Sequence, residues 1–171
     1  ILTRNPKRSS RPHLTYAKWD VANQEIDVVA VAKANCIVHL AGEGVADKRW
    51  TDKRKQAIVD SRVQSGQFLV KVLSENKHQV TSFISASAIG WYGADTPQSV
   101  EQGFQETDAA DDSYLGNTCK LWEESTAAIE KMGIRLVVFR IGIVLNKNGG
   151  ALAELDRKST RLNSSHITIS Y

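Results

Sequence analysis

Short apolar runs that alternate with segments of helical period constrain the fold of this chain more than any other feature. The runs CIVHLAG at 36–42, TSFISAS from Thr81 and IRLVVFRIGIVL from Ile134 are of this kind. Such runs are typical of strands that are buried on both faces of a parallel sheet. A further strand is expected around residues 16–19, and ILT at the start has the pattern of a strand end.

Two longer segments between these runs have the 3.6-residue period of amphipathic helices. The first is expected to begin near Thr51, an N-cap that Asp52 follows at the positive end of the helix dipole. The second is expected to run from Ser113 to Gly133, a residue type that favours the position after a helix. The predicted inward stripes are Ile58, Arg62, Ser65, Leu69 and Val72 in the first helix, and Leu115, Cys119, Trp122, Thr126 and Ile129 in the second.

This order of elements predicts right-handed βαβ crossovers, and therefore an α/β fold with a Rossmann-like, doubly wound parallel sheet. Ligands of such sheets bind outside the carboxyl ends of the strands. That rule selects four loops, at residues 3–8, 40–50, 85–93 and 141–150, which together hold most of the glycines. Glycine lets the backbone approach a ligand closely, and aromatic residues in these loops could wall a flat ligand.

Four motifs at these places resemble one family. HLAG at 39–42, WTDKRKQAIVDSR at 50–62, SASAIGWYG at 85–93 and RLVVFRIGIVL at 135–145 are similar to extended short-chain dehydrogenases/reductases of the NAD(P)-dependent epimerase/dehydratase-like branch. A narrower resemblance, to an atypical subgroup described as sugar-nucleotide epimerases or cell-division-inhibitor-like proteins, covers residues 1–155. The resemblance implies a Rossmann domain, a small substrate lobe after it, and a nicotinamide dinucleotide cofactor.

The resemblance assigns most of the candidate residues to cofactor binding. NAD-preferring domains carry an acidic residue at the place of Arg4, so a basic residue there implies NADP rather than NAD. A surface arginine before Pro6 is the alternative, and a tight turn alone would also explain Gly42. The predicted cofactor residues are Thr3, Arg4, Leu40, Ala41, Gly42, Arg62, Ser85, Lys120 and Arg140.

Ser87 and Tyr92 are the candidate catalytic residues. Ser87 corresponds to the Ser or Thr that hydrogen-bonds the reacting oxygen in the family, although a small residue at a crowded strand end is the alternative. The superfamily takes its proton from a Tyr-x-x-x-Lys pair on one helix face. Here Tyr114 and Lys120 are six residues apart, and Gly116 stands where the tyrosine belongs. Tyr92 is therefore the candidate proton donor.

Two arginines lie within apolar patterns, where a charge needs a partner or a ligand phosphate. For Arg62 and Arg140, a structural pair with a carboxylate or with carbonyl groups is the alternative to cofactor binding. Cys36 and Cys119 do not form a disulfide framework and are expected to be small buried residues in a reducing cytoplasm. The sequence contains no metal-ligand spacing.

The last sixteen residues follow none of these patterns. DRKSTRLNSSH at 156–166 matches one reading frame of a common sequencing adapter, so residues 156–171 are predicted to be a non-native, disordered tail. Residues 1–155 are then a partial NAD(P)-binding Rossmann domain. The tail carries +2 of the formal net charge of +3, which leaves +1 and removes the case for a nucleic-acid partner. No apolar run approaches the roughly 20 residues of a membrane span.

Two functions are compatible with these features. The first is a fragment of a cytoplasmic, NADP-dependent oxidoreductase or epimerase-like enzyme that acts on a small polar substrate. The second is a regulator that binds NADP and a protein partner without turnover. The broken Tyr-x-x-x-Lys pair is the feature that favours the regulator.

The first strand and the glycine-rich turn that cradles the pyrophosphate are expected before Ile1, and the substrate lobe after Leu155. We therefore expect the 171-residue chain to bind NADPH weakly or not at all, and its open sheet edges to promote aggregation. Calorimetric titration of the chain with NADPH measures the affinity. A nanomolar dissociation constant would contradict this expectation.

Overall fold

The computed structural model describes residues 1–45, 48–146 and 149–150, so the tail at 156–171 lies outside the described residues. Within the described part, no helix is long and apolar enough to cross a membrane. The described elements, in chain order, are β1 (Leu2–Thr3), β2 (Ala17–Asp20), β3 (Glu25–Ile26), α1 (Val28–Ala32), β4 (Cys36–His39), α2 (Asp52–Glu75), β5 (Ser82–Ala88), the 3₁₀ turn η1 (Ile89–Tyr92), α3 (Pro97–Gln102), α4 (Tyr114–Glu124), α5 (Ala128–Lys131), β6 (Arg135–Ile141), β7 (Leu145–Asn146) and β8 (Gly149–Gly150).

The strands form two three-stranded sheets and one short pair. In the first sheet, β2 pairs in parallel with β1 and antiparallel with β3. In the second, β4, β5 and β6 are all parallel, with Ser85 in register between His39 and Val138. Helices connect the three parallel strands of the second sheet, so the predicted α/β fold with a parallel sheet is confirmed.

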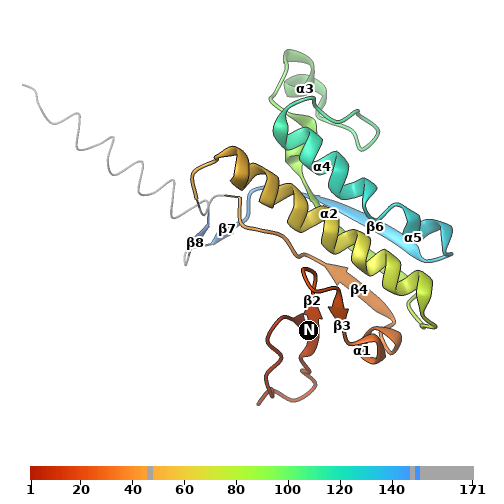
Figure 1. The fold of residues 1–171 in the computed structure, drawn as a ribbon. Coiled ribbons are helices and arrows are strands. Elements are labelled where there is room, and N and C mark those ends of the chain that lie inside the picture. Colours follow the sequence, from red (N-terminus) through yellow and green to blue (C-terminus); the bar gives the residue numbers. More distant parts are fainter. Residues whose placement is uncertain (46–47, 147–148, 151–171) are drawn as a thin grey trace, which may run out of the picture.

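Helices α2, α4 and α5 cover one face of the parallel sheet (Figure 1). The crossovers from β4 to β5 and from β5 to β6 move across the sheet in the same direction. Because such crossovers are right-handed, their helices lie on the same face of the sheet. On the other face, Val38 is 56% and Phe139 53% exposed. The prediction that the strand at 36–42 is buried on both faces is therefore wrong for the described residues: Cys36 and Val38 are exposed, whereas Ile37 and His39 are buried.

Helix α2 contributes the largest part of the core. Thr51 caps it by accepting a hydrogen bond from the Arg54 amide at 3.2 Å, as the sequence predicts. All five positions of the predicted inward stripe are buried. Leu69 and Val72 of that stripe pack with Phe83 of β5 in the main hydrophobic cluster. Burying each such side chain contributes about 1.5–3 kcal/mol, which holds the helix on the sheet.

The helix predicted from Ser113 to Gly133 is interrupted after Glu124. The Ser125 hydroxyl donates to the Trp122 carbonyl at 2.6 Å, and the Thr126 hydroxyl donates to a carbonyl one residue further on at 3.2 Å. Such side-chain bonds compete with the helical backbone pattern. The backbone bonds at this point also span three residues instead of four, which ends α4 and begins α5.

The inward stripe predicted for this second helix is correct at four of its five positions, which are all buried. Leu115 is the exception, with 36% of its surface exposed. It lies beneath η1, where a Cβ on Gly90 would stand 3.2 Å from the Leu115 Cβ. Leu115 therefore packs against the turn that follows β5 and not against the sheet.

His39, at the end of β4, is a titratable side chain in the interior. It is only 2% exposed, and its Nε2 lies 2.9 Å from the Ser65 hydroxyl of α2. Its ring meets the Trp19 ring edge-on, with the centroids 6.2 Å apart. His39 Nδ1 and Trp19 Nε1 have no hydrogen-bond partner in the described part of the chain. Burial lowers the pKa of His39 from 6.5 to about 4 because a buried imidazolium loses its hydration.

Mild acid should therefore destabilise the fold. Between pH 6.5 and about 4 the unfolded state protonates His39 while the folded state does not, so stability that is complete above pH 6.5 is lost as the pH falls. The full loss is roughly 3 kcal/mol. The free energy of unfolding, measured with urea across this pH range, should fall as the pH falls, and His39→Gln should remove this slope.

His13→Gln removes an exposed histidine and is the matched control, which should keep the slope. The imidazole NMR signals of His39 report its titration midpoint directly, even if the variant folds poorly. A midpoint near 6.5 in the folded protein would refute the prediction.

Candidate functional site

Electrostatic contributions connect the loop after β4 with Arg4, the residue after β1. A hydrogen bond and the charge of Arg54 hold the pKa of Glu43 below its usual value, and Lys48 and Arg4 add smaller contributions. The Arg4 charge is therefore within electrostatic reach of the β4 loop. The Arg4 side chain is exposed and makes no hydrogen bond or ion pair with the described residues; only its carbonyl is engaged, by Lys18 Nζ at 3.2 Å.

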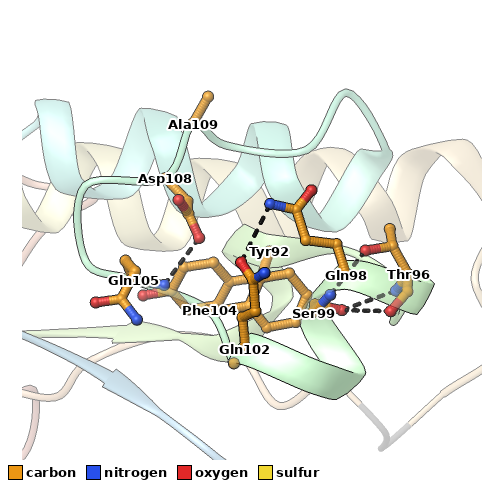
Figure 2. A pocket seen from close by; sticks show the side chains of 10 residues that line it. Tyr92, Thr96, Gln98, Ser99, Gln102, Phe104, Gln105, Asp108 and Ala109 are labelled. Atoms are coloured by element: carbon orange, nitrogen blue, oxygen red, sulfur yellow. Dashed lines mark hydrogen bonds between the residues drawn. The ribbon is translucent and has the colours of Figure 1, made fainter.

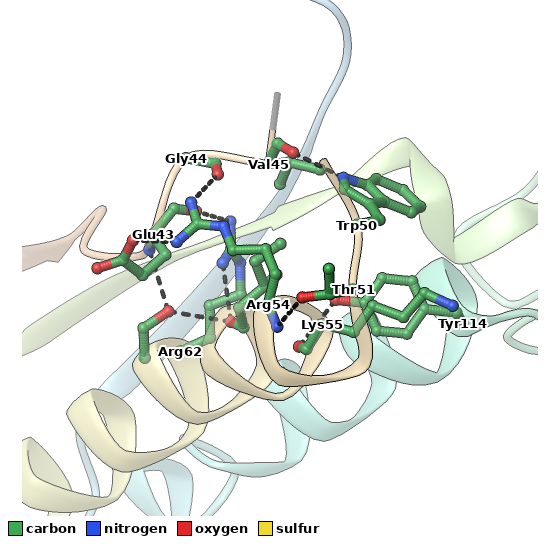
Figure 3. A network of polar contacts seen from close by, with 11 residues as sticks. Glu43, Gly44, Val45, Trp50, Thr51, Arg54, Lys55, Arg62 and Tyr114 are labelled. Atoms are coloured by element: carbon green, nitrogen blue, oxygen red, sulfur yellow. Dashed lines mark hydrogen bonds and ion pairs between the residues drawn. The ribbon is translucent and has the colours of Figure 1, made fainter. Parts of the chain in front are cut away.

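Arg62 joins α2 to the loop after β4 (Figure 3). Its guanidinium donates to the carbonyls of Ile58 at 2.9 Å and Glu43 at 3.1 Å, and its Cζ lies 4.9 Å from the centroid of the Trp122 ring. The side chain is 8% exposed, and burial lowers its pKa. No carboxylate pairs with it in the described ranges. A Cβ on Gly42 would lie 3.1 Å from Arg62 Cζ, so glycine permits this close approach.

Further polar contacts hold the same loop on α2 (Figure 3). Arg54 makes an ion pair of 2.6 Å with Glu43 and donates to the Gly44 carbonyl at 2.6 Å. The Trp50 indole donates to the Val45 carbonyl at 2.8 Å. These bonds hold residues 43–45 and Trp50 in place beside the first turns of α2.

Ser85 and Ser87 lie on one face of β5, as the strand period predicts, and that face is covered by helices. They are 0% and 2% exposed, respectively. The Ser87 hydroxyl donates to Glu123 Oε1 at 2.6 Å. An ionised carboxylate only accepts, so the single proton of Ser87 is committed to Glu123. The predicted contact between Ser87 and a substrate oxygen would require this bond to open.

Arg140, near the end of β6, has the most polar partners of any predicted site residue. Its Nε and Nη2 donate to the two oxygens of Glu123 at 3.0 and 3.1 Å. Its Nη1 donates to Tyr92 Oη and to the Glu106 carbonyl, both at 3.0 Å. Its Cζ stands 3.7 Å from the centroid of the Trp91 ring. The hydrogen bonds to Glu123 are the main reason why the pKa of Arg140 is raised.

Tyr92 borders a cavity of about 280 Å³ (Figure 2). Its ring stacks on Phe104 with the centroids 4.8 Å apart. The other lining residues, mostly amides and hydroxyls, are Thr96, Gln98, Ser99, Gln102, Gly103, Gln105, Asp108 and Ala109. The cavity thus suits a small polar molecule. Of the two predicted catalytic residues, Tyr92 lines this cavity and Ser87 does not.

The helix α4 has no room for the tyrosine of the superfamily pair. Gly116 is buried, and a Cβ there would collide with the backbone carbonyl of Asp111. Tyr114 instead donates its hydroxyl to the Lys55 carbonyl at 3.0 Å. Lys120 is exposed. Tyr114 and Lys120 therefore do not share a face, as their spacing predicts.

The predicted residues thus fall into two groups and some outliers. Gly42 and Arg62 meet at the β4 loop, to which the charge of Arg4 extends, whereas Ser87 and Arg140 are joined through Glu123, and Tyr92 through Arg140, at the ends of β5 and β6. The remaining predicted residues are Thr3, whose hydroxyl accepts from the Asn5 amide at 3.4 Å, Leu40, which is 66% exposed, the half-buried Ala41, Ser85 and Lys120. No group of three metal-ligating side chains occurs among the described residues. The cofactor roles of all these residues stay predictions.

Glu123 is the site residue that the sequence reading missed. It binds both Ser87 and Arg140. It follows Cys119 by four residues and stands beside Trp122, so it flanks the inward stripe of its helix. A carboxylate in that position, matched with an arginine in an apolar strand, is the signal that could have revealed the pair.

Comparison with known sequences assigns the family. The model of the NAD dependent epimerase/dehydratase family matches residues 2–148. The epimerase family protein YfhF of Bacillus subtilis is 34% identical over 154 residues, which cover 87% of this chain and 48% of YfhF. The epimerase family protein SSP1921 of Staphylococcus saprophyticus is 32% identical over 152 residues, which cover 89% of this chain and 49% of the relative. The chain belongs to the NAD-dependent epimerase/dehydratase family, and it spans about half the length of these relatives.

Solved structures agree with this assignment. A nucleoside-diphosphate sugar epimerase from Corynebacterium glutamicum has a TM-score of 0.68 and 31% identity, covering 90% of this chain and 30% of that protein. The human epimerase family protein SDR39U1, crystallised with NADPH, has a TM-score of 0.69 and 20% identity, covering 91% and 49%. The second likeness concerns the fold. Together they confirm the Rossmann-like class.

Gly116→Ala should destabilise the protein although alanine favours helices. Placing a Cβ against the Asp111 carbonyl requires the backbone to shift, which costs about 1–3 kcal/mol, more than the roughly 1 kcal/mol gained in helix propensity. Gly142→Ala is the matched control because a Cβ there meets no atom within 4 Å. Urea unfolding compares the two variants; equal stabilities would refute the collision.

Proposed function

We propose that this chain is part of an NADP-dependent oxidoreductase or epimerase-like enzyme that acts on a small polar substrate. The observation that carries the proposal is Arg4, an exposed arginine directly after β1 whose side chain makes no hydrogen bond or ion pair with the described residues. Such a guanidinium can pair with a phosphate group of a ligand. Arg62 donates to the carbonyls of Ile58 and Glu43, which is its structural alternative, so a ligand phosphate would have to replace those bonds. Both cysteines are free, and we extend the proposal to a cytoplasmic protein.

The residues present fit a nicotinamide dinucleotide. The β4 loop offers backbone next to Gly42, and the strand ends that frame it are where Rossmann-like sheets bind their ligands. Among the similar structures, SDR39U1 is crystallised with NADPH and a UDP-glucuronic acid 4-epimerase from Bacillus cereus with NAD. The exposed Arg4 favours NADP, because its guanidinium can pair with the 2′-phosphate. A bound cofactor would supply the hydride chemistry.

The proton chemistry is assigned to this chain. Tyr92 places its phenol at the rim of the polar cavity, where it can donate a proton to a substrate oxygen. The role predicted for Ser87, orienting the same oxygen, would require both that its bond to Glu123 opens and that the substrate reaches β5, because Ser87 is 2% exposed and does not line the cavity. The amides and hydroxyls around the cavity support a small polar substrate.

A second candidate function is a regulator that binds NADP and a protein partner without turnover. The collision of any side chain at Gly116 with Asp111 favours it, because the usual proton donor of the superfamily is sterically excluded. Full-length protein that binds NADPH tightly but oxidises it with no carbonyl compound of a broad panel would support the regulator over the enzyme.

Arg4→Glu should change the cofactor preference of the full-length protein that contains this chain. Losing a charge-assisted bond to the 2′-phosphate costs about 1.5–3 kcal/mol, which corresponds to roughly 10- to 100-fold weaker NADPH binding. NADH binding should change little. Calorimetric or fluorescence titration with both cofactors measures the ratio.

Arg11→Glu is the control, since it reverses an exposed charge in the same N-terminal loop and should leave the ratio unchanged. Equal NADPH affinities in Arg4→Glu and Arg11→Glu would exclude the assigned role of Arg4. Absence of any nicotinamide binding by the unchanged full-length protein would overturn the proposed function itself.

A further inference from the structure

The cluster of Glu123, Arg140 and Tyr92 supports an inference that rests on the proposed function and deepens it. We infer that Arg140, held by Glu123, is a positioning residue that fixes the Tyr92 hydroxyl as a hydrogen-bond acceptor and thereby turns its proton toward the substrate. The superfamily places a lysine four residues after its tyrosine on one helix. Here Arg140 of strand β6 would replace that lysine, and Tyr92 of η1 would replace that tyrosine.

The direction of the bond between Arg140 and Tyr92 follows from the chemistry of the two groups. A guanidinium only donates, so at 3.0 Å the Tyr92 oxygen must accept. The phenolic O–H then cannot point at Arg140. No acceptor among the described residues takes it either, because the bond from Arg140 is the one hydrogen bond that Tyr92 Oη makes there. The phenolic proton therefore has no acceptor among the described residues, on a side chain that lines the cavity.

The ring of Tyr92 is also held in place. It stacks on Phe104 with an interplanar angle of 18°, and Arg140 Cζ lies 5.2 Å from its centroid. Arg140 in turn lies over the Trp91 ring at 3.7 Å. These planar contacts limit rotation of the phenol, so the hydroxyl keeps one position relative to the cavity.

Glu123 sets the orientation of Arg140. The two oxygens of Glu123 accept hydrogen bonds from Nε and Nη2 of Arg140 at 3.0 and 3.1 Å, which is a bidentate ion pair. Both side chains are only 15% exposed. Such a pair fixes the plane of the guanidinium. Nη1 is thereby directed at Tyr92 and at the Glu106 carbonyl. Four hydrogen bonds engage Arg140, so we assign it to positioning in place of the cofactor contact expected from the sequence.

The proton step balances within these groups. The O–H bond of Tyr92 breaks, a new O–H bond forms on the substrate oxygen, and the electron pair stays on the phenolate. Arg140 Nη1 would donate to the phenolate oxygen as it does to the phenol. A proton from solvent then restores Tyr92.

Steady-state kinetics of the full-length protein, with NADPH and a reducible carbonyl substrate, tests this inference. Tyr92→Phe and Arg140→Met should each lower kcat about 100-fold, within the range for losing general-acid catalysis, with KM changed less than about threefold. The double variant should be no slower than either single variant, because both changes disable one step. Arg140→Lys should recover part of kcat, since it keeps the charge.

Arg135→Met is the matched control, because Arg135 is an exposed arginine of the same strand. An Arg140→Met enzyme as fast as Arg135→Met would overturn the inference and leave the proposed function standing. A double variant whose loss in kcat equals the product of the two single losses would also overturn the inference. If the unchanged protein showed neither turnover nor cofactor binding, that result would instead refute the proposed function, and the inference with it.

A second measurement does not depend on turnover. With ¹⁵N-arginine labelling, the side-chain NMR signals of Arg140 can be assigned as those that Arg140→Lys removes. Tyr92→Phe should shift the Nη1 signals of Arg140, whereas Glu123→Gln should perturb all of its side-chain signals. Unchanged Nη1 signals in Tyr92→Phe would show that the bond to the phenol does not form.

Discussion

The packing of α2 against the parallel sheet is the interaction on which the rest of the structure depends. The face that buries Leu69 and Val72 against Phe83 also sets the position of the first turns of the helix. Those turns present Arg54 and Arg62 to the loop after β4. Core burial thus determines where these two arginines meet the loop.

The site has two halves, which helix α4 brings together. Trp122 of that helix lies under the guanidinium of Arg62, and the next residue, Glu123, holds Arg140. One half thus contains Arg62, which has no carboxylate partner among the described residues, and the other contains a tyrosine held by an arginine. A change in the packing of α4 on α2 would move both halves at once. Gly66 sets this packing, because a Cβ there would strike the Ser125 side chain.

Local signals predicted much of this fold. The cap at Thr51 and the stripe of α2 depend on contacts within a few residues or on one buried face, so their pattern was readable. The break after Glu124 could not be predicted, because the apolar helical period continues to Ile129. The break results from hydrogen bonds of the Ser125 and Thr126 hydroxyls to backbone carbonyls. Arg140 and Tyr92 were predicted as site residues, but their contact and the partner Glu123 were not, for another reason. The partners of Arg140 lie 17 and 48 residues away in sequence, and only the strand register brings them together.

The contact between Gly116 and Asp111 limits what can be built at this point of α4. A single substitution at residue 116 cannot place a tyrosine there, because the backbone at residue 111 would first have to move. That backbone is tied to the site, since the Asp111 amide donates to the Trp91 carbonyl at 2.7 Å. An engineered Tyr-x-x-x-Lys pair in this helix would therefore require a redesign of the loop that holds Trp91 and Tyr92.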